Sequence, residues 1–407
     1  MRGILRGIAA IAALAAVSWP LSCASTERRS AVPLDLSTKA YVSGFPSEIR
    51  YYPRDAEHVE KFVEDYLASL ERERNWLETQ GYKGPLPPSS FLAISGGGDN
   101  GAFGAGLLNG WAKAGTRPAF KIVTGVSTGA LIAPFAFLGP EWDERLKTLY
   151  TEISMEDVAK PRWFASVLFQ DAMADNSPLL KLIQRAITRE MLDAIAAEYE
   201  KGRILLVATA NLDVRRAVIW NVTKIATSRS HAALELVQKI LVASAAIPGS
   251  FPPVMIDVEA GGKPYQEMHV DGGTVAQVFI YPAAIRLHDL VPRDRTLYII
   301  RNARLDPEWA EVERRTLPIA LRAISSLIQY QGIGDLYRIY TVTQRDQVAY
   351  RLAYIPQSFD TPHVSDFDKE YMRSLFKLGY AMAEKGYPWE NRPPVLVSGV
   401  DEEARAH

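Results

Sequence analysis

Ser127 is the first residue whose type and setting suggest chemistry. It lies at the centre of GVSTG, between Gly125 and Gly129, after the segment Lys121–Thr124 and before the apolar segment ALIAPFAFLG. The first segment predicts a strand and the second a helix, and a serine between glycines at such a turn is typical of a nucleophile elbow. The helix N-terminus also favours negative charge that develops on the hydroxyl oxygen. A GxSxG match alone is weak, but in this setting we predict that Ser127 is a catalytic nucleophile.

A serine hydroxyl is a poor nucleophile unless a neighbouring base takes its proton. Asp271 is a candidate for that base, because VDGGTV puts it at the end of an apolar strand. Its side chain is ionised at neutral pH unless its pKa, ordinarily about 3.9, is strongly shifted. Gly272 and Gly273, which follow it, would permit close approach of another element. Asp-Gly is also an ordinary turn pair, so Asp271 alone would not identify a site.

Histidine is the more usual partner of a catalytic serine, and the chain has six. His269 precedes Asp271 by two residues and therefore faces the same side of the predicted strand, about 6.5 Å further back. We interpret it as a histidine of the core, or as one that supports the site from behind, rather than as the base. His288 and His363 follow Asp271 in the chain, as the histidine of an α/β-hydrolase triad would, so a Ser-Asp-His site stays open as an alternative.

The glycine-rich segment FLAISGGGDNGAFGAG, from Phe91 to Gly106, allows two interpretations. Gly96, Gly98 and Gly101 fit GxGxxG after a predicted strand, which is one mark of a dinucleotide site. Such a site would need an acidic residue about twenty positions further on, at the end of the next strand, where this chain has the serine turn instead. We therefore predict that backbone N–H groups of the loop form an oxyanion hole, in which each donor stabilises a transition state by about 2.7–4 kcal/mol.

The apolar segments around these motifs predict an α/β fold. Continuous apolar strands at Phe91–Ile94, RILLVATANLD, RRAVIWN and MHV alternate with helical segments, such as the periodic run from Leu234 to Leu241. Continuous apolar strands imply a mainly parallel sheet that is covered on both faces. Ligand chemistry in such folds gathers at the carboxyl ends of the strands, and all three motifs are expected to lie there.

The N-terminus has the features of an export signal. Two arginines among the first six residues precede the apolar run Ile8–Val17, which is too short to cross a bilayer comfortably. Cys23, the only cysteine, ends this region in PLSC, which is similar to a bacterial lipobox but has proline where leucine is usual. We expect residues 1–23 to be a signal peptide and Cys23 to carry lipid, with simple cleavage after the next residue as the alternative. The protein would then be exported and held at a membrane surface of the bacterial cell envelope.

Residues 24–90 are expected to form a polar tether followed by a packing helix. Apolar side chains recur in the second part at helical spacing, with charged residues on the other face. They are Val59, Phe62, Val63, Tyr66, Leu67 and Leu70. The charge is mixed rather than basic, which favours packing against the protein over binding to a membrane surface.

Composition and length limit the remaining possibilities. The 407 residues carry a formal net charge of -1 and are 48% hydrophobic, which is ordinary for a globular protein. No basic stripe, metal-ligand cluster or cofactor motif is evident, so we expect no nucleic acid partner, no metal and no cofactor.

After the tether we divide the chain into a catalytic core at 91–285 and an α/β extension packed on it at 286–407. The extension's periodic segment LPIALRAISSLIQYQGIGDLYRIY is expected to be core, with a lid or a membrane-facing surface as alternatives.

Taken together, the three motifs resemble the patatin-like phospholipase family. SGGGDNG at Ser95–Gly101, GVSTG, and DGG at Asp271–Gly273 occur in the order of that family. The segments DNSPLLKLI, ASAAIPGSFPPV and FDKEYMRSLFKLGYAMAEKG are also similar, so the resemblance extends from Phe91 to Gly386.

The resemblance implies a three-layer α/β/α fold and a Ser-Asp dyad that needs no histidine. In such a dyad Ser127 would be the nucleophile and Asp271 the proton acceptor. The loop Gly96–Gly101, chiefly Gly97 and Gly98, would form the oxyanion hole. The implied substrates are acyl esters of lipids, so the implied activity is that of a lipid acyl hydrolase.

Two residues depart from the family pattern. Ser95 stands where aspartate often precedes the glycines, and Asn100 replaces the basic residue that is common before the last glycine. The second departure bears on phospholipid preference more than on hydrolysis, since a basic residue there could assist phosphate recognition. An alternative from another class is a non-catalytic envelope lipoprotein that binds lipid or a partner.

Overall fold

A mixed sheet forms the centre of the protein. The computed structural model describes residues 28–161, 172 and 174–394. Within these residues nine strands form one sheet. Seven of them follow the order β1-β7-β6-β3-β2-β10-β11, and the hairpin of β8 and β9 joins the sheet through the pairing of β9 with β6. Five adjacent strands run parallel to one another: β6, β3, β2, β10 and β11. The other four, β1, β7, β8 and β9, join through antiparallel pairs. The strands are β1 (Arg50–Tyr51), β2 (Ser89–Ile94), β3 (Phe120–Val126), β6 (Ile204–Asn211), β7 (Arg216–Asn221), β8 (Val254–Ala260), β9 (Lys263–Asp271), β10 (Arg295–Arg301) and β11 (Val348–Tyr354), while β4 (Lys160–Pro161) and β5 (Ala174–Asp175) pair separately. The predicted α/β fold with a mainly parallel sheet is confirmed.

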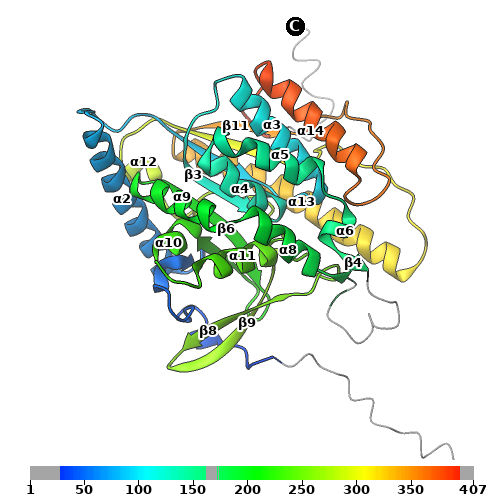
Figure 1. Ribbon diagram of the computed structural model, residues 1–407, viewed down its shortest axis with the longest axis horizontal. Coiled ribbons are helices and arrows are strands. Elements are labelled where there is room, and N and C mark those ends of the chain that lie inside the picture. Colours follow the sequence, from blue (N-terminus) through cyan, green and yellow to red (C-terminus); the bar gives the residue numbers. More distant parts are fainter. Residues whose placement is uncertain (1–27, 162–171, 173, 395–407) are drawn as a thin grey trace, which may run out of the picture.

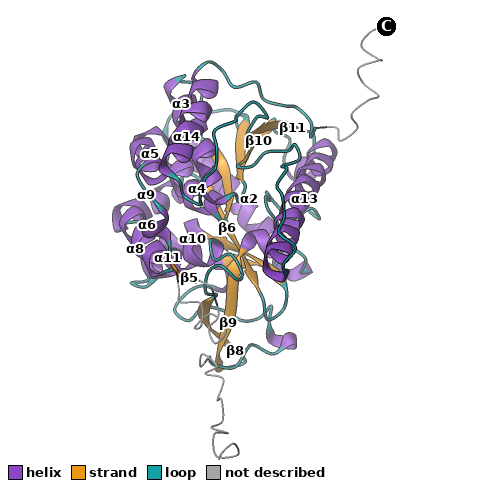
Figure 2. Cartoon of the chain, turned by 90° about the vertical axis from the view of Figure 1, so that its right-hand side faces the viewer, coloured by secondary structure: helices purple, strands orange, loops and turns teal. Residues whose placement is uncertain are grey.

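Helices cover both faces of this sheet and give three layers (Figure 2). Successive residues of a strand alternate between two apolar cores: Leu92 and Ile94 of β2 belong to one, and Phe91 and Ala93 to the other. The helices of the first core are α3 (Gly101–Lys113), α4 (Thr128–Leu138), α5 (Asp143–Thr151), α8 (Ser177–Ala186), α9 (Arg189–Glu200), α10 (Val222–Thr227), α11 (Ala233–Ser244) and α14 (Lys369–Glu384). Those of the second are α2 (Ala56–Thr79), α12 (Leu287–Leu290) and α13 (Thr316–Arg345). Burial on both faces explains why the strands read as continuous apolar runs.

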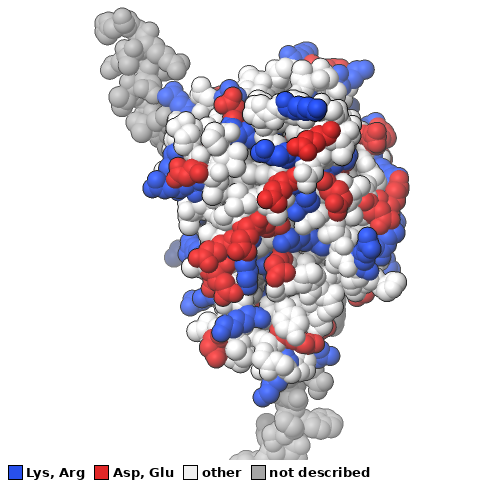
Figure 3. All heavy atoms as spheres, turned by 90° about the vertical axis from the view of Figure 1, so that its left-hand side faces the viewer, with Lys and Arg blue, Asp and Glu red and all other residues white. Residues whose placement is uncertain are grey.

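The long helix α2 packs on the sheet as its sequence predicts. Phe62, Tyr66 and Leu70 are buried in the second core, whereas Leu67, which was expected to join them, is partly exposed. The side chain of Asp55 caps the helix by accepting a hydrogen bond from the backbone N–H of His58 at 3.2 Å. Acidic and basic side chains intermingle on the side of the molecule where α2 lies (Figures 1 and 3).

The C-terminal part of the chain supplies two strands of the same central sheet. β10 lies between β2 and β11 and is parallel to both. The last helix, α14, packs directly against α3. A Cβ atom at Gly106 or Gly110 of α3 would collide with backbone oxygens of Phe376 and Tyr380, so only glycine permits this approach. Residues 286–394 therefore belong to the same architecture as the central sheet and α3.

Helix α13 is much longer than the strands that it connects. Its 30 residues span about 45 Å, while the seven residues of β10 span about 23 Å. The helix ends at Arg345, near the start of β11, which pairs with the start of β10. Its N-terminal half therefore projects past the carboxyl edge of the sheet (Figure 1), where Gln329 Nε2 donates to the carbonyl of Arg304 at 2.9 Å.

The expectation that all of this helix is core is wrong for its first half. Leu336, Ile339 and Val342 are buried in the second core, but Ile319 is 51% exposed, and Leu327 and Tyr330 are each 70% exposed. The helical period is present throughout, yet the sheet is too short to cover Ile319, Leu327 and Tyr330. Among residues 28–161 and 174–394, no helix is both long and apolar enough to cross a membrane.

The segment before β1 lies along the β8–β9 hairpin. Arg28 pairs with Asp213 at 2.8 Å, and the backbone N–H of Gln266 donates to the carbonyl of Ser30 at 3.1 Å. Tyr41 exchanges backbone hydrogen bonds with Glu259 of β8. From residue 28 onward the expected tether is thus bound to the hairpin that leads to Asp271. The predicted signal peptide and Cys23 lie outside the described residues.

Candidate active site

Ser127 occupies a strained turn between β3 and α4. Its φ of 54° and ψ of -127° are unusual for a residue with a side chain, and such strain is common at functional sites. Gly125 and Gly129 are both required, because a Cβ at Gly125 would collide with the carbonyl of Gly129, and one at Gly129 with that of Ile94. The backbone N–H of Ser127 donates to Ser244 Oγ at 3.0 Å, which holds the turn from the side of α11. The predicted strand, turn and helix are all present here.

Asp271 reaches the same region from the opposite direction. It was expected to end a strand of the parallel set, but β9 is antiparallel to β6, and Asp271 pairs with Thr209 near the carboxyl end of β6. The strand is also longer than the predicted MHV, because it forms a hairpin with β8 that carries it beyond the sheet (Figure 2). β9 therefore approaches the carboxyl edge of the parallel strands from beyond that edge. It places the carboxylate of Asp271 at the edge where β3 ends.

The carboxylate of Asp271 is buried and interacts with the predicted nucleophile. Burial raises its pKa to about 6 from an ordinary value of 3.8, although hydrogen bonds from the Ser127 side chain and the Gly273 backbone each lower it. The Gly273 N–H donates to Asp271 Oδ1 at 2.7 Å. As the sequence suggests, the glycines allow a close approach: a Cβ at Gly272 would lie 2.5 Å from the carbonyl oxygen of Ala208 in β6.

The glycine loop follows β2 and turns into α3 beside Ser127. A Cβ at Gly96 would lie 3.1 Å from that of Ser127, so the loop and the serine turn are in contact. The N–H of Gly96 already donates to the carbonyl of Gln277 at 3.1 Å, and that of Gly101 donates to the carbonyl of Gly98. The N–H groups of Gly97 and Gly98 donate no hydrogen bond within the described part of the chain. Of the four glycines predicted to line an oxyanion hole, these two have amides that are free to bind a ligand.

Two residues that sequence reasoning missed hold this loop in place. Buried Asn302, just after β10, donates from its N–H to Ser95 Oγ at 2.9 Å and from Nδ2 to the Ser95 carbonyl at 3.0 Å. Buried Gln277 accepts from Gly96 and donates from Nε2 to the carbonyl of Gly273 at 2.8 Å, which joins the glycine loop to the aspartate turn. Both residues are far from the loop in sequence and lie in no motif, so only the fold identifies them. The hydroxyl of Ser95, a departure from the family pattern, is the acceptor that Asn302 uses.

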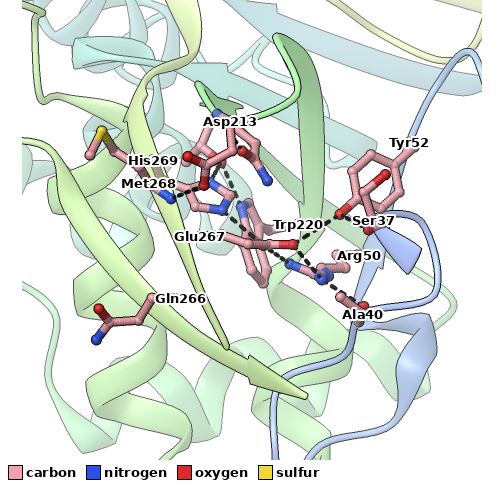
Figure 4. Close-up of polar contacts among 12 residues, drawn as sticks. Ser37, Ala40, Arg50, Tyr52, Asp213, Trp220, Gln266, Glu267, Met268 and His269 are labelled. Carbon is pink, nitrogen blue, oxygen red and sulfur yellow. Dashed lines mark hydrogen bonds and ion pairs between the residues drawn. The ribbon is translucent and has the colours of Figure 1, made fainter. Parts of the chain in front are cut away.

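His269 is a core residue, as its position on the strand predicts. Its Nδ1 lies 2.8 Å from Thr209 Oγ1, and its Nε2 lies 3.1 Å from Glu267 Oε2. Glu267 in turn pairs with buried Arg50 at 2.6 Å (Figure 4). Burial would raise the pKa of Glu267, but Arg50 and His269 together lower it to about 2. Both ring nitrogens of His269 are thus engaged in a network that anchors β9.

The other two histidines considered for a triad are placed differently. His288 is exposed on the short helix α12, and His363 Nε2 lies 2.7 Å from Asp99 Oδ2 in the glycine loop. Among the described residues, no hydrogen bond joins a histidine to Ser127 or Asp271. The described residues also contain no group of three or more histidine, cysteine, aspartate or glutamate side chains arranged to hold a metal ion.

The comparison with known proteins agrees with this geometry. Residues 92–284 match the sequence model of the family described as patatin-like phospholipase, and this region of the chain belongs to that family. This region contains the serine turn, the aspartate turn and the glycine loop. No curated protein matches the chain in sequence.

Among solved structures, the protein is similar to VipD from Legionella pneumophila, with 12% sequence identity and a TM-score of 0.37 over 73% of this chain and 66% of VipD. It is also similar to full-length ExoU from the type III secretion system of Pseudomonas aeruginosa, solved in complex with SpcU. That match has 14% identity and a TM-score of 0.28 over 74% of this chain and 52% of the other. This chain therefore spans less than two thirds of the length of either protein.

Proposed function

We propose that the protein is a serine lipid acyl hydrolase that cleaves carboxylic ester bonds of lipids, phospholipids among them, through a Ser127–Asp271 dyad. The observation that carries the proposal is the meeting of three features at one sheet edge. They are a strained serine turn, a buried aspartate whose pKa the Ser127 side chain lowers, and a glycine loop with two amides that donate no hydrogen bond within the described residues. Membership of the patatin-like phospholipase family supports a lipid ester as the substrate.

In the proposed reaction, Asp271 accepts the proton of Ser127 as Oγ attacks the ester carbonyl carbon. The N–H groups of Gly97 and Gly98 stabilise the negative charge on the tetrahedral oxygen. Collapse of this intermediate breaks the ester C–O bond, and Asp271 returns the proton to the leaving alcohol. A water molecule then attacks the acyl-enzyme by the same route and releases the fatty acid. A pKa of about 6 makes Asp271 a stronger base than an ordinary aspartate while leaving it largely ionised at neutral pH.

The nucleophile is tested by labelling the full-length protein with a fluorophosphonate probe. We expect one labelled serine, identified as Ser127 by peptide mass spectrometry, and no labelling of Ser127→Ala. Fatty acid release is then measured on phospholipids, lysophospholipids, neutral lipids and short esters. Persistent labelling of Ser127→Ala at another serine would contradict the assignment. If folded wild-type protein is inert to every ester and probe, a non-catalytic envelope lipoprotein becomes the better interpretation.

Histidine substitutions distinguish the dyad from the Ser-Asp-His alternative. The dyad predicts full activity for His288→Ala. For His363, glutamine is the informative replacement, because its side-chain amide can still donate a hydrogen bond but cannot serve as a general base. Activity of His363→Gln within a few-fold of wild type is expected for a dyad, whereas a triad would lose activity by orders of magnitude.

We further propose that the protein is exported and held at a membrane by lipid on Cys23. The proposal rests on the sequence of the first 23 residues and its similarity to a bacterial lipobox. Cys23→Ser should leave export possible but release the protein from the membrane fraction. Unchanged membrane association of that variant would argue against the lipid anchor.

A further inference from the structure

The outer side of the glycine loop is bound by the segment that leads into α14. We call residues 359–371 the clamp segment. Asp99, the residue after the two glycines with free amides, is buried, and its Oδ2 accepts two hydrogen bonds from the clamp segment. The donors are His363 Nε2 at 2.7 Å and the backbone N–H of Phe367 at 2.8 Å. Phe367 has a φ of 56°, so the backbone adopts a strained conformation at the residue whose amide contacts the loop.

Asn100, the next residue of the loop, is held by the same segment. Its Oδ1 accepts a hydrogen bond from the hydroxyl of Tyr371 at 2.6 Å. The ring of Tyr371 in turn packs against the ring of His363, at 4.4 Å between centroids, and against Phe359 at 5.6 Å. Asn100 therefore acts as an acceptor within the protein. An arginine or lysine at this position has donors only and would abolish the bond that Tyr371 donates.

The clamp segment is itself attached to a rigid support. It leads into α14, which packs on α3 through the glycine contacts at Gly106 and Gly110, and α3 is the helix that the loop begins. On the inner side of the loop, Asn302 fixes Ser95 through two hydrogen bonds. Gly97 and Gly98 thus lie between two fixed points. Glycines have the freest backbone of any residue, so the direction of their N–H groups depends on how firmly those points are held.

From these contacts we infer that the clamp segment positions the oxyanion hole, with His363 and Tyr371 acting through Asp99 and Asn100 as positioning residues. The inference rests on the proposed function, because it assigns a task to the amides of Gly97 and Gly98. It also gives Asp99 and Asn100 a different role from phosphate recognition: they bind the clamp segment. Loss of the clamp is expected to affect the transition state, where the oxyanion forms, more than substrate binding.

The test compares His363→Ala and Tyr371→Phe with two matched controls. Val364→Ala removes an exposed side chain of the same segment, and Tyr380→Phe removes a hydroxyl of α14 that makes no hydrogen bond among the described residues. On a soluble short-chain ester, kcat should fall about ten- to hundredfold in the two clamp variants, with KM within twofold of wild type. His363→Gln should restore most of the loss, and both controls should match wild type.

A second measurement does not depend on turnover. Hydrogen exchange followed by mass spectrometry should show faster exchange of the peptide that contains residues 95–101 in His363→Ala and Tyr371→Phe, with unchanged exchange in β3 and β6. If wild type hydrolyses esters and the clamp variants have normal kcat, the inference is overturned while the proposed function stands. If wild type is inert, the proposed function fails. The exchange measurement still tests the clamp in that case, and unchanged exchange of the loop peptide in the two clamp variants would reject it.

Discussion

At the scale of single residues, Asp271 should set the pH dependence of the reaction. A base must be ionised to accept a proton, and burial raises the pKa of this carboxyl to about 6. We expect kcat/KM on a soluble ester to be flat from about pH 7 to 8 and to fall about tenfold per pH unit below about 6. The profile should fit a single ionisation. A midpoint near the ordinary aspartate value would show that Asp271 is not the group that limits the rate.

The same carboxylate should lower the stability of the folded protein at neutral pH. Its pKa rises from 3.8 to about 6 on folding, so the folded state binds the proton more tightly and the free energy of unfolding falls as pH rises from about 4 to about 6. Asp271→Asn removes this ionisation and can still accept from Gly273. At pH 7 to 8 we expect it to raise the free energy of unfolding by about 2–3 kcal/mol, since each pKa unit corresponds to about 1.4 kcal/mol.

That gain should shrink toward pH 4, where wild type is also neutral at this position. Denaturant unfolding at pH 4.5 and 7.5 measures the difference, and Asp257→Asn, at an exposed position of β8, is the control. Asp271→Asn should also lose activity by orders of magnitude. A pH-independent change in stability, or near-normal turnover, would contradict the role of this carboxylate.

The backbone strain at Ser127 gives a prediction of its own. A positive φ in a residue with a side chain costs about 1–3 kcal/mol, and glycine adopts it readily. Ser127→Gly and Ser127→Ala should both be inactive, but the glycine variant should be more stable than the alanine variant by about 1 kcal/mol or more. The same pair of substitutions at Ser326, inside α13, should give the opposite order, because glycine weakens a helix. Equal stability of the two Ser127 variants would mean that the turn relaxes.

At the scale of elements, α13 combines a buried half with an exposed one. Leu336 is 1% exposed and Leu327 is 70% exposed, although both are leucines of the same helix. Leu336→Ala should lower the free energy of unfolding by about 2–5 kcal/mol, and Leu327→Ala should change it by less than about 0.5 kcal/mol. Denaturant unfolding measures both. A large loss for Leu327→Ala would mean that the projecting half of α13 is covered in solution.

At the scale of the whole molecule, the sequence predicts what is encoded locally. The serine turn, the aspartate turn and the glycine loop each combine special backbone geometry with flanking apolar segments, so short windows reveal them. The central strands are buried on both faces, and their unbroken apolar runs indicate a covered parallel sheet. Ser127, Asp271, Gly97 and Gly98 meet because carboxyl ends of parallel strands share an edge, and β9 reaches that edge from the outside.

What the sequence did not predict depends on contacts across the chain. Asn302 and Gln277 are ordinary polar residues until the sheet order brings them to the loop. The exposure of Ile319, Leu327 and Tyr330 follows from a mismatch between helix length and strand length, which the periodicity of the sequence alone does not reveal. The direction of β9 depends on its pairing with β6, and the glycine pattern alone could not separate the free amides of Gly97 and Gly98 from the occupied ones.

The support of the glycine loop by distant segments has a consequence for protein synthesis. The loop is made early, but Asn302 follows it by about two hundred residues, and 264 residues separate Asp99 from His363. A nascent chain that has reached only the end of the family-matched region, at residue 284, holds Ser127 and Asp271 but lacks both supports of the loop. The smallest fragment able to order its oxyanion hole must therefore extend through α14. A shortened chain that ends before the clamp segment would therefore keep Ser127 and Asp271 but lose the contacts that this segment makes with Asp99 and Asn100.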